Sequence, residues 1–111
     1  MRAPNLGDLR DRVALDRPVL DADGVRDGWT EAALLPARIL YLKGGETVQA
    51  ARLAGRQPAV VTIRAAGAPV GLSPEWRLRD PRRGVVYQLR AVVPAPNPAW
   101  LELTVESGAA G

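Results

Sequence analysis

The side chains that most often carry out enzyme chemistry are scarce in this chain. It contains no histidine and no cysteine, which removes the commonest general base, the thiolate nucleophile and the usual nitrogen and sulfur metal ligands. Ser73 and Ser107 lie in glycine- or proline-rich stretches with no lysine nearby to activate them. The glycine pair in KGGE, residues 43–46, fits neither a phosphate-binding loop nor a dinucleotide fingerprint. We therefore predict that the protein is not an enzyme and that it binds no cofactor or metal.

Carboxylates are the remaining groups that could act as a catalytic pair. Their positions argue against this role, because turns and the polar faces of strands are normally surrounded by water. The carboxylates expected in turns are Asp21, Asp23, Asp27 and Asp80, and those expected on polar strand faces are Asp16 and Glu102. We expect all six to be solvated surface charges.

Arginine and tryptophan offer a second kind of chemistry, the binding of nucleic acid. The chain has 15 basic residues against 12 acidic ones, and Lys43 is the only lysine. With these arginines, Trp29, Trp76 and Trp100 could stack on single-stranded bases across an OB-like barrel. However, the arginines are interleaved with acids, whereas a nucleic-acid surface gathers them. Since the chain has no phenylalanine, tryptophans packed at the rim of a core or between subunits are the favoured interpretation.

Alternating apolar residues predict about six strands. They fall at 12–16, 29–43, 58–66, 76–78, 84–93 and 100–106, with turns at 21–28 and 80–84 and loops at 67–74 and 94–98. Pro18 should end the first strand, and Pro36 should break the second or mark a bend or an edge. The pattern predicts a mainly β single domain over 1–111, a small antiparallel barrel or sandwich, with a frayed tail at 107–111. No apolar run is long enough to span a bilayer, so we expect no membrane partner.

Two segments depart from plain alternation. In ARILYL, Ile39 and Tyr41 share one face of the strand and Leu40 and Leu42 share the other, which indicates a strand covered on both sides, for example by a neighbouring subunit. Residues 43–57 instead read as a short helix in a long loop, with Gly44–Gly45 before it and Gly55 after it. A helix this short is marginal in water, so it must pack on something or move.

The order of these pieces resembles the phage head–tail joining family, the stopper or head-completion proteins of long-tailed phages. The resemblance rests on LRDRVALDRP at 9–18, DADGVRDGW at 21–29, ARI at 37–39, GGETVQAARL at 44–53, VTIR at 61–64, GVVYQLRAVV at 84–93 and LELTVE at 101–106. The chain departs from the family at Gly24–Val25, where a glycine pair is common, and matches only loosely over 67–79. Phage-derived gene transfer agents use the same part.

This resemblance implies a virion component that is assembled in the bacterial cytoplasm and located at the head–tail interface. It implies a homo-oligomeric ring, with six subunits favoured and twelve as the alternative, between the portal or adaptor and the tail terminator or tail tube. Packaged double-stranded DNA passes through such a ring. The inserted loop of the family corresponds to residues 43–57, where the candidate channel residues are Lys43, Gly44, Gly45, Glu46, Gln49, Arg52, Gly55 and Arg56. The loop would close the channel or line it.

The candidate ring surfaces follow from the doubly apolar strand and the aromatic residues. They are Trp29, Ile39, Leu40, Tyr41, Leu42, Trp76 and Trp100. Two other functions stay open from the sequence. One is an OB-like module that binds single-stranded nucleic acid, and the other is a tail-terminator ring protein.

Overall fold

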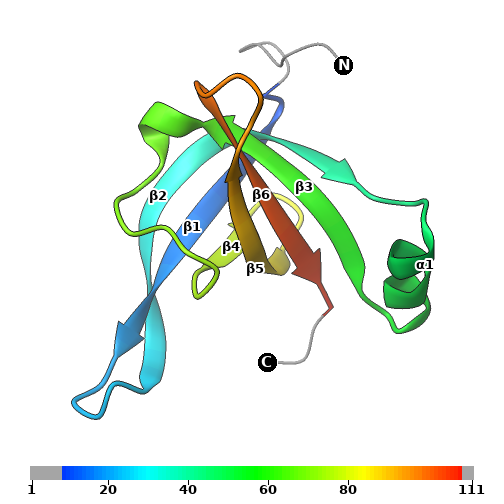
Figure 1. Cartoon of the computed structure of the whole chain (residues 1–111). Coiled ribbons are helices and arrows are strands. Elements are labelled where there is room, and N and C mark those ends of the chain that lie inside the picture. Colours follow the sequence, from blue (N-terminus) through cyan, green and yellow to red (C-terminus); the bar gives the residue numbers. More distant parts are fainter. Residues whose placement is uncertain (1–8, 109–111) are drawn as a thin grey trace.

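A computed structural model describes residues 9–108 and shows a closed antiparallel barrel (Figure 1). The strands close in the order β1-β2-β3-β6-β5-β4. Their bounds are β1 Asp11–Leu20, β2 Arg26–Tyr41, β3 Gln57–Arg64, β4 Arg77–Asp80, β5 Val85–Pro94 and β6 Trp100–Ser107. Helix α1, Glu46–Leu53, lies in the β2–β3 connection, and a single 3-10 turn, η2 Ala65–Gly67, follows β3. The predicted mainly β fold, with six strands and one short inserted helix, is confirmed.

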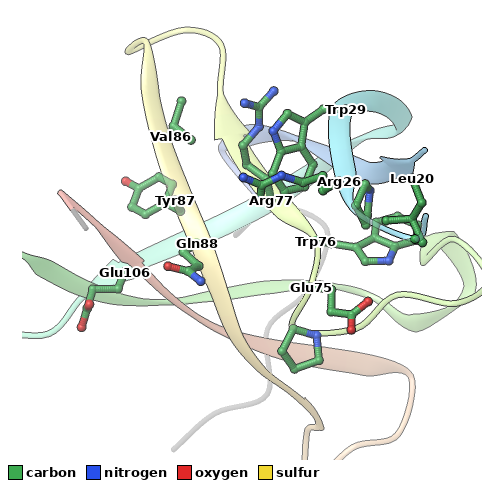
Figure 2. Close-up of a pocket in the computed structure, with 13 residues that line it drawn as sticks. Leu20, Arg26, Trp29, Glu75, Trp76, Arg77, Val86, Tyr87, Gln88 and Glu106 are labelled. Carbon is green, nitrogen blue, oxygen red and sulfur yellow. The ribbon is translucent and has the colours of Figure 1, made fainter. Parts of the chain in front are cut away.

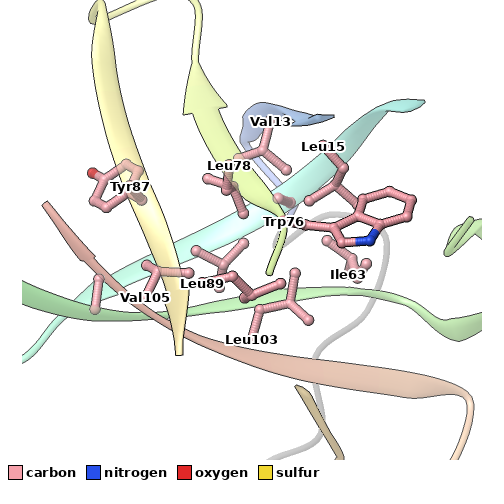
Figure 3. Close-up of a cluster of buried hydrophobic side chains, with 12 residues drawn as sticks. Val13, Leu15, Ile63, Trp76, Leu78, Tyr87, Leu89, Leu103 and Val105 are labelled. Carbon is pink, nitrogen blue, oxygen red and sulfur yellow. The ribbon is translucent and has the colours of Figure 1, made fainter. Parts of the chain in front are cut away.

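The barrel interior is filled by alternate residues of all six strands (Figure 3). Period-two alternation brings these side chains to one face of each strand, and closure turns that face inward. Tyr87 and Trp76 supply the large aromatic volume, with exposed fractions of 1% and 4%. The aliphatic part of the core consists of Val13, Leu15, Ala37, Ala59, Val61, Ile63, Leu78, Leu89, Leu103 and Val105.

β1 and β2 extend beyond the barrel as a two-stranded hairpin, which we call the hairpin arm (residues 17–30). β1 pairs with β4 only from Ala14 to Asp16, whereas its pairing with β2 continues to Leu20. At the tip, the Asp21 carboxylate accepts hydrogen bonds from the backbone N–H groups of Asp23 and Val25, at 2.9 and 3.0 Å. Figure 1 shows the arm as a projection at the lower left.

The prediction that Pro18 ends the first strand was wrong. β1 runs through Pro18, which lies opposite Trp29 on β2. Among the described strands, β1 has only β2 as a neighbour at this position, so one side of the strand needs no backbone donor. Proline is tolerated on such an edge, and the arm can therefore continue past it.

Pro36 does not interrupt the second strand either. β2 is a continuous 16-residue strand, so the predicted break was wrong. Pro36 pairs with Arg12 of β1, and pairing with β3 begins only at Arg38. It therefore occupies an edge position on one side, as the alternative prediction had it. Long β2 changes neighbour there, from β1 to β3, and this change lets one strand take part in both the arm and the barrel.

The C-terminal strand is longer than its alternation indicated. Ser107, expected in the frayed tail, is the last residue of β6 and pairs with Gln57 and Tyr87. Of the rest of the expected tail, Gly108 follows the strand as an exposed bend and residues 109–111 lie outside the described residues.

Candidate functional site

The segment 43–57, which we call the helical loop, is closed at its base by the ends of β2 and β3. The Leu42 N–H donates to the Pro58 carbonyl at 3.0 Å, and the Gln57 side-chain amide donates to the Leu42 carbonyl at 2.9 Å. Figure 1 shows α1 beside the barrel, on the side away from the hairpin arm. These bonds continue the pairing of β2 with β3 up to the base of the loop.

Glycines set both joints of the helical loop. Gly45, the N-cap of α1, has φ 91°, and Gly55 after the helix has φ 81°. Both lie in the left-handed region that favours glycine. The helix N-terminus has no side-chain cap, and only Ala51 of the helix is buried. Leu53 exposes 89% of its surface. The predicted short helix on glycine joints is therefore present, and little apolar surface holds it to the barrel.

Polar contacts inside the loop join several of the candidate channel residues. The Lys43 carbonyl accepts hydrogen bonds from Gln49 Nε2 at 3.2 Å and from Arg52 Nη1 at 3.4 Å. Gly44 and Glu46 are exposed. The structure thus brings together three of the eight candidate channel residues around one carbonyl, next to the entering strand.

Arg56 contacts the end of the barrel as well as the helical loop. Its guanidinium donates to Glu106 of β6 at 3.2 Å, and Arg90 of β5 donates to the same carboxylate oxygen at 3.2 Å. The Arg56 N–H also donates to the Ala51 carbonyl at 2.9 Å. Arg56 therefore links the end of the loop to the neighbouring strands.

The ARILYL strand, expected to be covered on both sides, has one face toward the barrel core and one toward solvent. Ile39 packs against the core cluster, and the Tyr41 hydroxyl is hydrogen-bonded to that of Tyr87 at 3.3 Å. Burial and this hydrogen bond raise the pKa of the Tyr87 hydroxyl above its ordinary value. On the outer face Leu40 exposes 49% of its surface, whereas Leu42 is half-buried. Leu40 is therefore an apolar side chain left partly open on the barrel wall.

The three tryptophans occupy different environments. Trp76 and Trp100 are only 4% and 5% exposed. Arg17 covers the Trp76 ring at 5.0 Å, and Arg64 lies 5.4 Å from the Trp100 ring centre. These two rings therefore have little surface left for a base or for a neighbouring subunit.

Trp29 is the half-buried member of the three and lies on the hairpin arm. Its ring has Arg26 at 4.5 Å and Arg77 at 4.7 Å from the centroid. Cation–π contacts of this kind contribute about 0.5–1 kcal/mol each at exposed sites. The Arg77 contact ties the arm to β4, whereas the Arg26 contact lies within the arm.

The prediction that Asp16 is a solvated surface charge was wrong. Asp16 is 1% exposed, and its carboxylate accepts from Arg77 Nε at 2.8 Å and from Arg79 Nε and Nη2 at 2.6 and 3.0 Å. Arg79 also donates to Glu31 of β2 at 2.8 Å. Burial raises the pKa of Asp16, but the hydrogen bonds and charges of Arg79 and Arg77 outweigh it and hold the pKa below its usual value. This network fixes the root of the arm to β4.

Asp80 was also expected to be solvated and is instead 1% exposed. Its carboxylate accepts from the N–H groups of Arg82 and Arg83 at 3.1 and 3.2 Å and from the Arg83 guanidinium at 2.7 Å. Arg83 donates in addition to Asp11 of β1 at 2.9 Å. Asp80 therefore stabilises the β4–β5 turn and connects it to the start of β1. The tip residues Asp21, Asp23 and Asp27 are exposed, as predicted.

A broad groove runs between the hairpin arm and strands β4 and β5 (Figure 2). It measures about 740 Å³ and is lined by Pro18, Leu20, Gly24, Arg26, Trp29, Pro74, Glu75, Trp76, Arg77, Val86, Tyr87, Gln88 and Glu106. The lining combines arginine and tryptophan from the arm side with polar and apolar residues of the barrel wall. Such a surface suits contact with another protein chain better than it suits a small substrate.

The described residues contain no cluster of three or more acidic side chains spaced to hold a metal ion. Over the same residues, no helix has the length and apolar character that crossing a membrane requires. Sequence reasoning missed the burial of Asp16, the burial of Asp80 and the hairpin arm. The sequence did contain a signal for the buried Asp16. Arg77 and Arg79 in WRLRD lie on the same face of one strand, so both can bind one anion on a neighbouring strand.

The comparisons with known proteins identify a family from the sequence and similar folds among solved structures. A family model described as phage head completion protein matches residues 4–108. The solution structure of protein SF1141 from Shigella flexneri 2a aligns with a TM-score of 0.66 at 20% identity, covering 97% of this chain and all of that one. A chain in the virion of a native gene transfer agent particle aligns with a TM-score of 0.64 at 22% identity, with the same coverage. No curated protein is similar enough in sequence to count as a relative.

Proposed function

The chain belongs to the phage head completion protein family, and we propose from this that it is a stopper, a structural connector whose ring lies between portal or adaptor and tail. The ring contains six subunits, with twelve as the alternative. It receives the tail terminator or tail tube on one face and surrounds the packaged double-stranded DNA. The protein is assembled into the virion in the bacterial cytoplasm and stays at the head–tail interface. Its similarity to a chain of a gene transfer agent virion supports the virion setting.

The structure of the helical loop is the main support for this proposal. It is sealed at its base by the Leu42–Pro58 hydrogen bond and jointed at Gly45 and Gly55, so it moves as a unit while the barrel stays intact. In the ring, the loop lines or closes the channel. A channel element must yield to DNA rather than grip it, and affinity for phosphate rises with each basic contact. The exposed charges of the loop are mixed, with Glu46 between Lys43 and Arg52.

A loop replacement tests the proposal. Residues 44–56 are exchanged for Asn-Gly, which closes a two-residue hairpin turn between Lys43 and Gln57. The variant should fold, because the loop contributes only one buried side chain, Ala51. Particles assembled with it should lose packaged DNA or fail to join tails, measured by DNA content after purification and by electron microscopy. The matched control is Arg56→Ala in the intact loop, which removes the bond to Glu106 alone and should leave particles intact.

The outcomes separate the roles of the loop. Tailed particles that retain DNA with the shortened loop would show that the loop is not a channel element. A shortened chain that does not fold would show that the loop is part of the core. Native mass spectrometry of rings released from particles gives the subunit number from the 11.9 kDa chain mass.

The single-stranded nucleic-acid alternative is weakened by the tryptophan environments. Two of its three stacking platforms, Trp76 and Trp100, are 95% or more buried. Only Trp29 keeps a partly open ring, between two arginines. A titration with single-stranded DNA at low salt distinguishes the two functions. Bases that stack on tryptophan quench its fluorescence, whereas the connector role predicts no quenching.

A further inference from the structure

The hairpin arm exposes apolar side chains that its own barrel does not cover. Val19, Leu20 and Val25 expose 39%, 57% and 61% of their surfaces. A two-stranded hairpin that packs against nothing else is only marginally stable in water. Apolar side chains gathered on a projecting element mark an interaction surface more often than isolated ones do. We therefore expect a surface other than its own barrel to bury the apolar side chains at the end of the arm.

The same tip is acidic. Asp23 and Asp27 are exposed, and Asp21, also exposed, uses one carboxylate oxygen to hold the turn. The basic residue of the tip, Arg26, is turned back onto the Trp29 ring at 4.5 Å. The tip consequently offers a partner an apolar centre around Val25 with negative charge on either side.

A surface of complementary chemistry lies at the other end of β1. A cleft of about 570 Å³, which we call the arginine cleft, is lined by the apolar Leu34, Pro36 and Pro81 and by the exposed Arg10, Arg12 and Arg82. The acidic residue there, Asp11, binds Arg83 at 2.9 Å and accepts the Ile39 N–H at 3.2 Å, so its charge is already matched. Leu34 exposes 43% of its surface. The arginine cleft is therefore positive with an apolar floor.

Tip and cleft cannot meet within one chain. β1 begins at the arginine cleft and ends at the tip, and its ten residues span roughly 30 Å. Figure 1 shows the start of β1 at the top of the barrel and the tip at the lower left. Two complementary surfaces at opposite ends of one subunit make a heterologous contact, which generates a ring when the rotation closes.

We propose that the tip of the hairpin arm of one subunit inserts into the arginine cleft of the next copy of the same chain, and that this contact builds the ring. This inference rests on the ring proposed above and specifies its interface. Val25 enters between Leu34 and Pro36, and the tip aspartates face the cleft arginines. The opposite charges steer the two subunits into one register. The Asp16 network, which fixes the root of the arm, sets the angle between neighbours.

A cysteine pair tests the contact, because the natural chain has no cysteine. Asp23→Cys and Arg82→Cys are combined in one chain, and assembled particles are oxidised. Head-to-tail contact predicts a ladder of covalent oligomers that stops at the subunit number of the ring. Each single-cysteine chain is the control and should give nothing larger than a dimer. A double-cysteine chain that cross-links to a different virion protein, or remains monomeric, in particles that keep their ring overturns the interface but leaves the connector role standing. Particles assembled with the natural chain that nevertheless do not contain it would overturn both the interface and the connector role.

Charge reversal gives an independent readout. A tip variant with Asp23→Arg and Asp27→Arg, and a cleft variant with Arg12→Asp and Arg82→Asp, should each lose ring assembly. The chain that carries all four changes should recover it, since both surfaces are reversed together. Mixing the two separate variants should also restore the ring, because in a ring of alternating variants each reversed tip meets a reversed cleft and each unchanged tip meets an unchanged cleft. Full rings from either variant alone, or no recovery in the four-fold variant, contradict the proposal.

Discussion

Replacing Asp16 by asparagine should detach the hairpin arm from β4 with little change in side-chain volume. The carboxylate is 1% exposed and accepts three hydrogen bonds from two arginines, Arg77 and Arg79. Asparagine keeps one acceptor oxygen and turns an amide N–H₂ toward a guanidinium that can only donate. At least one arginine then loses its partner at the root of the arm.

The size of the effect follows from the exposure of the partners. Breaking a buried ion pair by removing one member costs about 3–5 kcal/mol when the other charge stays buried. Arg77 and Arg79 are 29% and 30% exposed at their side chains, so both can regain part of their hydration. A loss of about 2–3 kcal/mol in the free energy of unfolding is therefore expected. For a domain of this size, that corresponds to a fall of about 10 °C in melting temperature.

Urea unfolding at pH 7, followed by tryptophan fluorescence, measures this loss, and a pH series tests its cause. Burial raises the Asp16 pKa, and Arg79 and Arg77 lower it by more, so the net pKa lies below the ordinary value of 3.8. A carboxyl with a lowered folded-state pKa stabilises the fold above its unfolded pKa and loses that contribution as pH falls through the folded pKa. The gap between the natural chain and Asp16→Asn should thus shrink as pH falls below about 4.

The control is Asp27→Asn, the same chemical change at an exposed position on the arm. It should alter the free energy of unfolding by less than about 0.5 kcal/mol. The reasoning fails if Asp16→Asn costs no more than this control at pH 7. It also fails if the Asp16→Asn deficit stays constant between pH 7 and pH 3, because a charge-independent deficit would come from packing alone.

Two further predictions concern the tyrosine pair and the glycine joints. In alkaline titration of the Tyr41→Phe chain, absorbance at 295 nm should show no tyrosinate until the chain unfolds, because burial raises the pKa of Tyr87; ionisation in the folded chain would contradict this. Gly45→Ala and Gly55→Ala should each lower the free energy of unfolding by about 1 kcal/mol, since φ is 91° and 81° there. Gly44→Ala, which meets no atom within 4 Å and is not left-handed, should leave it nearly unchanged; equal effects at all three sites would exclude a backbone cause.

Local patterns were sufficient to predict the elements and much of the fold. Alternation of apolar residues placed all six strands, and the glycines around ETVQAARL bounded the helix within one or two residues. The turn at 80–84 and the tip at Asp21–Gly24 followed from residues that favour turns. These features depend on φ preferences and on a period of two or 3.6 residues, which neighbouring positions in the sequence determine.

The roles of Pro18, Pro36 and Asp16 depended on distant partners. Pro18 and Pro36 stay within strands because the neighbouring strand is missing on one side at each position, and sequence position does not reveal that. Asp16 is buried because Arg77 and Arg79, 61 and 63 residues away in the sequence, lie beside it across the barrel seam.

The sequence alone therefore determined a six-stranded antiparallel β fold with an inserted helix on glycine joints, because period and turn chemistry are local. Tertiary structure decided that β1 and β2 leave the barrel as an arm, that Trp76 and Trp100 are buried while Trp29 stays partly open, and that an acidic tip and an arginine cleft lie at opposite ends of β1. Those properties arise from strand pairing and barrel closure. Closure determines which side chains of distant segments meet, and no local pattern encodes it.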